Sequence, residues 1–101
     1  MKPLACELGA FDAAERRRYD ALRRELAEAR RGTQELPDGF AFLYPGEPDL
    51  FRKLSEWILL ERRCCSFLSF SLRFDAEPPA VRLELVGGEG VKRFLQSQLA
   101  G

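Results

Sequence analysis

Residues 33–44 read TQELPDGFAFLY, two short runs on either side of a Pro-Asp-Gly turn. An Asp-Gly pair between two such runs is a strong hairpin signal, because glycine accepts the backbone angles of a tight turn. In the second run Phe40, Phe42 and Tyr44 alternate with aliphatic residues, so the three rings share one face of the strand. The segment therefore predicts a β-hairpin with one face directed into a core.

A second hairpin is predicted in the later half of the chain. Residues 66–75 and 81–85 both alternate between apolar and polar side chains, and a Pro-Pro pair at 78–79 separates them. A period of two is typical of a strand with one buried face. That face is expected to carry the apolar members of both runs, which are Leu68, Phe70, Leu72, Phe74, Val81, Leu83 and Leu85.

Three helices are predicted around these hairpins. Asp12 followed by Glu15 forms a capping-box pattern, so the first helix is expected to begin there. Pro48 suits the first turn of a second helix that runs to about Cys65. A last helix is expected to follow the glycine-rich residues 87–90.

The resulting element order is α-ββα-ββα, which favours an α+β fold in which a four-stranded antiparallel sheet has helices packed mainly on one face. A chain of this length is expected to form one domain, residues 1–101. Two ββα-like units, at about 33–65 and 66–100, follow the N-terminal helix and suggest a weak internal duplication. The other face of the sheet is expected to be exposed to solvent or to pack against a second copy of the chain in a homodimer.

The composition narrows the classes of partner and of chemistry. Sixteen basic residues balance sixteen acidic ones, so no overall field draws the protein to nucleic acid or to an anionic membrane. No apolar run is long enough to span a bilayer, and the first residues lack the hydrophobic core of a secretion signal, so a cytoplasmic protein is expected. The absence of histidine removes Ser-His-Asp and Cys-His catalysis and the usual catalytic zinc ligands.

The second helix carries an acidic residue within its apolar stripe. At about 100° per residue, Leu54 and Trp57 project to one side with Glu61 at the centre of that side. Cys64 and Cys65 follow at i+3 and i+4 and bracket the carboxylate. Burying a carboxylate without a partner costs free energy. Glu61 therefore requires a salt bridge, a helix end that is open to solvent, a metal ion, or a proton held by a raised pKa.

The three cysteines, Cys6, Cys64 and Cys65, complete the candidate site. An odd count with two adjacent members is unlike a secreted disulfide scaffold, so these residues are interpreted as core filler, soft-metal ligands or redox centres. Three thiolates suit Hg(II), As(III) or Cu(I), and adding Glu61 gives a four-ligand set that zinc accepts. No organic cofactor is implied.

Residues 60–70, LERRCCSFLSF, resemble the ERxCCPFLxF signature of a group of small, mostly uncharacterised bacterial proteins. Members of that group tend to have a cysteine ahead of the first helix, which Cys6 matches, and the likeness extends to residues 36–40 and 88–95. They occur alongside mercury- or arsenic-resistance functions, so the resemblance implies thiophilic metal or metalloid handling. Ser66 stands where the pattern has proline, which leaves the cysteine pair less rigidly presented.

Three functions remain open from the sequence. The first is a small metal- or metalloid-binding protein in which Cys6, Cys64 and Cys65 are thiolate ligands and Glu61 is a ligand or a nearby base. The second is a thiol-dependent enzyme, either redox or cleaving a carbon–metal bond of the organomercurial type, with Glu61 as candidate acid or base. The third is a non-catalytic interaction module that dimerises through the exposed sheet face.

Overall fold

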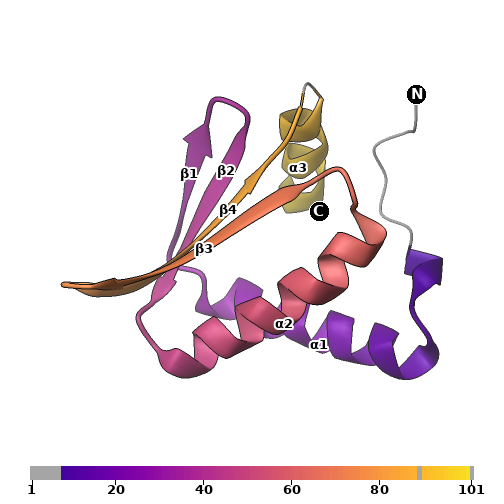
Figure 1. Cartoon of the computed structure of the whole chain (residues 1–101), viewed down its shortest axis with the longest axis horizontal. Helices are drawn as coiled ribbons and strands as arrows, with labels where there is room; N and C mark the ends of the chain where they lie inside the picture. Colours follow the sequence, from indigo (N-terminus) through magenta and orange to yellow (C-terminus); the bar gives the residue numbers. More distant parts are fainter. Residues whose placement is uncertain (1–7, 89, 101) are drawn as a thin grey trace.

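The computed structural model describes residues 8–88 and 90–100 of the chain (Figure 1). Within that range the order α-ββ-α-ββ-α and the α+β class are confirmed. No helix in the described part is both long and apolar enough to cross a membrane. The elements are η1 (Leu8–Ala10), α1 (Ala13–Ala29), β1 (Gly32–Leu36), β2 (Gly39–Pro45), α2 (Pro48–Cys64), β3 (Ser69–Ala76), β4 (Pro79–Val86) and α3 (Val91–Ala100).

The four strands form one antiparallel sheet in the order β1-β2-β4-β3. Phe42 on β2 and Leu72 on β3 both lie opposite Leu83 on the central strand β4. Because residues opposite each other point to the same face, this register gathers the alternating apolar residues of three strands on one side. Each predicted ββα-like unit supplies one central and one edge strand, while its origin by duplication stays a prediction.

Both predicted hairpins form, and one glycine is required by the sheet itself. Leu36 pairs with Gly39, which leaves Pro37 and Asp38 as a two-residue turn. A Cβ atom at Gly39 would lie 1.9 Å from the carbonyl oxygen of Leu85, so only glycine allows β4 to approach this closely. Any larger residue at this position would push the two central strands apart.

The strand predicted to begin at residue 66 begins later, at Ser69. The end of α2 explains the difference, because the N–H of Leu68 donates to the carbonyl of Cys65 at 3.2 Å and closes a turn. Leu68 is buried all the same, so it fills the core from this turn and not from the strand.

The first helix begins as its sequence predicts. A carboxylate oxygen of Asp12 accepts from the N–H of Glu15 at 2.8 Å, and Glu15 accepts from the N–H of Asp12 at 3.1 Å. This reciprocal capping box satisfies two N–H groups that the helix cannot bond internally. The buried residues of α1 are Tyr19, Leu22 and Leu26, which form one stripe.

The second helix runs beside α1 (Figure 1), and its apolar stripe faces the core. Its buried residues are Leu50, Leu54, Glu61 and Cys64. Ion pairs between exposed side chains join the two helices, Arg18 to Glu56 at 2.7 Å and Lys53 to Glu25 at 3.3 Å. Such exposed pairs stabilise weakly, so buried side chains hold most of the α1–α2 packing.

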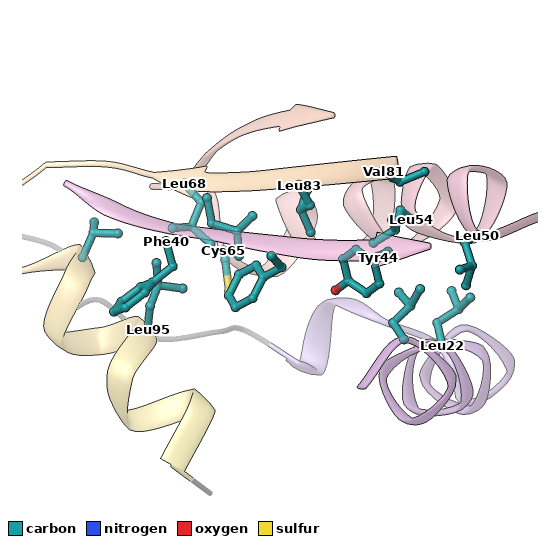
Figure 2. Close-up of a cluster of buried hydrophobic side chains, with 14 of the residues drawn as sticks. Leu22, Phe40, Tyr44, Leu50, Leu54, Cys65, Leu68, Val81, Leu83 and Leu95 are labelled. Atoms are coloured by element: carbon teal, nitrogen blue, oxygen red, sulfur yellow. The ribbon is translucent and has the colours of Figure 1, made fainter. Parts of the chain in front are cut away.

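The core lies between the helices and the Phe42 face of the sheet. Figure 2 shows Leu22 of α1 and Leu95 of α3 on the same side of the strands as Tyr44 and Leu83. The opposite face is polar, with Arg82 donating to the side-chain oxygen of Gln34 at 2.8 Å. The proposed homodimer through that face stays a prediction.

Replacing Leu54 by alanine tests how far the α2 stripe supports the fold. Leu54 has 0% of its surface exposed, so Leu54→Ala is expected to lower the free energy of unfolding by about 2–5 kcal/mol. Leu59, on the same helix but 61% exposed, is the matched control, and Leu59→Ala should change it by less than about 0.5 kcal/mol. Urea unfolding measures both, and equal losses would contradict the packing described here.

Candidate functional site

The carboxyl group of Glu61 lies in the core, as the helical stripe predicts. Glu61 sits in the last turn of α2 with only 5% of its surface exposed. The hydroxyl of Tyr19, from the facing helix α1, donates to its Oε2 at 2.5 Å. A tyrosine hydroxyl is therefore one partner that makes the buried carboxyl group tolerable.

Both neighbouring sulfur atoms converge on the other oxygen of Glu61. The Sγ of Cys64 lies 3.9 Å from Oε1, the Sγ of Cys65 lies 2.9 Å from it, and the two sulfurs are 3.8 Å apart. One donor atom from each of the three residues fits within 4.8 Å, and all three residues are buried. The structure thus brings together three of the four predicted site residues.

The backbone at the end of α2 explains how adjacent cysteines share one side. The N–H of Cys65 donates to the carbonyl of Glu61 at 2.7 Å, the regular helical bond, although Cys65 already leaves helical geometry. This bond keeps Cys65 against the last turn, so its sulfur stays next to the Glu61 carboxyl group.

The two described cysteines differ in oxidation state. Cys64 is a free thiol, whereas Cys65 is disulfide-bonded. A disulfide at Cys65 was not expected from the sequence. Cys6, the remaining predicted ligand, lies outside the described residues, so its place in the site stays a prediction. A metal ion would therefore gain Cys65 as a ligand only after reduction of this bond.

Burial dominates the electrostatics of the cluster. It raises the pKa of Glu61, an effect opposed by the hydrogen bond from Tyr19 and by the charge of Arg23. Burial also raises the pKa of Cys64 to about 11, and the neighbouring Glu61 charge adds to the rise. The thiol therefore keeps its proton at neutral pH, and a bound cation would have to displace it.

Arg63, the residue before Cys64, makes its contacts with the start of α1 and not with the cysteine cluster. The Arg63 guanidinium pairs with Glu15 and also donates to the backbone carbonyl of Ala10 at 3.0 Å. Its role is to hold the start of α1 against the end of α2. Arg23, on α1, is the cation whose charge is felt by both Glu61 and Cys64.

A cavity of about 220 Å³ adjoins the cluster on the carboxyl side. Tyr19 and Glu61 form part of its wall, and most of its other described lining residues are apolar. The two cysteines are not among these lining residues, so the cavity approaches the cluster through Glu61.

Comparison of the chain with protein-family models, with curated proteins and with solved structures finds no match. The resemblance of residues 60–70 to the bacterial ERxCCPFLxF proteins accordingly stays a prediction. The chemistry of the site must be argued from its own residues.

Tyr19 is the site residue that sequence reasoning missed. It was placed only on the apolar stripe of the first helix, beside Leu22 and Leu26. A signal was present, because a buried tyrosine usually finds a partner for its hydroxyl and a buried glutamate requires a donor. Two inward polar groups on consecutive helices could have been paired on that ground.

Removing the Tyr19 hydroxyl tests its support of the carboxyl group. Tyr19→Phe leaves buried Glu61 without this donor and is expected to lower the free energy of unfolding by about 1–3 kcal/mol. Tyr44 is the matched control, because it is also buried but its hydroxyl makes no hydrogen bond to a described residue. Tyr44→Phe should change the free energy by less than about 0.5 kcal/mol in the same urea titration. Equal effects of the two substitutions would refute the role given to Tyr19.

Proposed function

We propose that this protein binds a soft metal or metalloid ion, of the Hg, As, Cu or Zn class, at Glu61, Cys64 and Cys65 when Cys65 is reduced. The observation that carries the proposal is the closeness of the three buried donor atoms, all within 4.8 Å. Thiolate sulfur selects soft ions, and a carboxylate oxygen added to thiolates suits zinc.

The position of Glu61 supports a ligand role over simple packing. An apolar side chain at this point of the stripe would fill the core without the desolvation of a carboxyl group. Tyr19 holds Oε2 and leaves Oε1 directed at both sulfur atoms. Hydrogen bonds that orient a ligating group in this way are a regular feature of metal sites.

We place Cys6 as a third sulfur ligand. Cys65 is disulfide-bonded while Cys64 is free, and the chain has only three cysteines. This placement requires Cys6 to come within reach of Cys65, so that both thiols can share one ion when they are reduced. Three thiolates favour Hg(II) and As(III), in keeping with the resemblance to proteins found beside mercury- or arsenic-resistance functions, and a detoxifying role belongs to the same proposal.

Binding is favoured over thiol catalysis by the state of Cys64. A nucleophilic or redox cysteine acts as the thiolate, whereas burial raises the pKa of Cys64 to about 11. Carbon–metal cleavage would instead require Glu61 to deliver a proton to carbon while the sulfurs hold the metal. Turnover of an organomercurial by the reduced protein would favour this enzymatic alternative.

Metal titration of the reduced protein tests the proposal directly. Thiolate-to-metal charge-transfer absorption is expected to saturate at about one equivalent, and Cys64→Ser should weaken binding roughly tenfold or more. Glu61→Gln should weaken zinc binding by a similar factor and mercury binding less, because the carboxylate is the harder ligand. Glu56→Gln, an exposed change on the same helix, should leave both affinities unchanged.

Circular dichroism checks that each variant is folded before the titration. A folded, reduced protein without a stoichiometric band for any of the four ions would reject the site. So would a Cys64→Ser variant that binds as tightly as the parent chain.

Disulfide mapping tests the place of Cys6 separately. After mild oxidation with oxidised glutathione, trypsin is expected to release peptides 1–16 and 64–73 joined by a disulfide. Mass spectrometry should find the link retained in Cys64→Ser and lost in Cys65→Ser, because Cys65 carries the bond. A link that disappears in Cys64→Ser would contradict this assignment.

A further inference from the structure

The cavity between the helices and the sheet has features that the metal proposal does not use. Its volume is about 220 Å³. Its apolar lining includes Phe42 and Leu83 from the sheet, Trp57 from α2 and Leu95 from α3. A hollow lined by apolar groups from several elements is the usual form of a small-molecule site.

One polar group from the sheet opens onto this cavity without a partner. Tyr44 has only 7% of its surface exposed, and its hydroxyl makes no hydrogen bond to a described residue. Among the described residues no fully enclosed side-chain oxygen lacks a partner, so this hydroxyl is not fully enclosed, and Tyr44 is one of the residues that line the cavity. Figure 2 shows its oxygen directed away from β2 on the side where α1 lies.

The Tyr44 hydroxyl is protonated at neutral pH and can donate a hydrogen bond. Burial raises the pKa of Tyr44 to about 12, although the charge of Arg30 opposes the rise. At neutral pH the group is therefore a phenol with a proton to give. An unpaired donor in an apolar hollow is costly unless a ligand or water accepts from it.

Two arginines, one within α1 and one at its C-cap, add positive charge to the same cavity. Arg23 and Arg30 both line it, and neither forms an ion pair with a described residue. The Arg30 guanidinium carbon lies 5.4 Å from the ring centroid of Phe42, and that of Arg23 lies 5.8 Å from the ring of Tyr19. Aromatic faces thus hold both cations at the cavity.

Glu61 is the single acid among the described lining residues, so the two arginines outnumber it. Its Oε2 is engaged by the hydroxyl of Tyr19. The cavity therefore combines an apolar interior, a hydroxyl donor and two guanidinium groups. That combination matches a ligand with an apolar body and one anionic group.

We propose that this cavity binds a small monocarboxylic acid, with one aromatic ring or a short alkyl chain among the apolar side chains and its carboxylate between Arg30 and the hydroxyl of Tyr44. An apolar protein cavity of about 150 Å³ holds benzene, so this one has room for a single ring with its acid group. The site shares only Glu61 with the metal cluster and does not depend on it.

Benzoate is the probe, and Trp57, the chain's single tryptophan, is the reporter. Titration of the full chain is expected to give a saturable change in tryptophan fluorescence, which calorimetry should reproduce. Benzamide has the same shape without the charge and should bind about tenfold more weakly or worse. Equal affinities for the two would overturn the carboxylate site, as would no saturation of folded protein by about 20 mM benzoate, well above the affinity expected of so small a ligand.

Variants separate the named contacts from general charge attraction. Arg30→Gln should weaken benzoate about tenfold or more and leave benzamide unchanged, since it removes a charge-assisted hydrogen bond. Tyr44→Phe should weaken benzoate several-fold. Arg24→Gln is the matched control, an exposed arginine of α1 outside the cavity lining, and should have no effect. An equal loss in Arg24→Gln and Arg30→Gln would overturn the proposal.

Discussion

The buried carboxyl group of Glu61 constrains the whole α1–α2 side of the molecule. Its Oε2 accepts from Tyr19 on the facing helix, and its Oε1 contacts both sulfur atoms at the end of α2. A group this costly to bury fixes the relative position of the two helices, because sliding either one would leave it without these contacts. The exposed ion pairs around it, such as Arg18 with Glu56, add little by comparison.

Much of the fold could be predicted because local patterns here agree with the tertiary structure. Phe40, Phe42 and Tyr44 alternate along one face of β2 as the pattern predicts, and the Asp12–Glu15 pattern forms the capping box that it predicts. The late start of β3 could not be predicted, because the turn at Leu68 depends on a backbone bond to Cys65. The alternation of apolar and polar residues continues through this turn, so the pattern does not show where the strand begins.

The candidate site was predictable in part for the same reason. Helical geometry alone brings Glu61, Cys64 and Cys65 together, since the three share one turn. Tyr19 could not be paired with Glu61 from spacing, because the contact depends on how α1 crosses α2. The hollow beside Tyr44 likewise depends on distances between elements remote in sequence.

A chain of 101 residues has a small free energy of unfolding, and this one keeps several unfavourable features together. Three such features lie between α1, α2 and the sheet: the buried carboxyl group of Glu61, the Tyr44 hydroxyl without a hydrogen bond to a described residue, and the cavity that both residues line. Around these features Leu54, Val81 and Leu83 still pack with almost no exposure. These departures from close packing are therefore concentrated on one side of the molecule, where a functional site is expected to depart from the rules that the rest of the fold obeys.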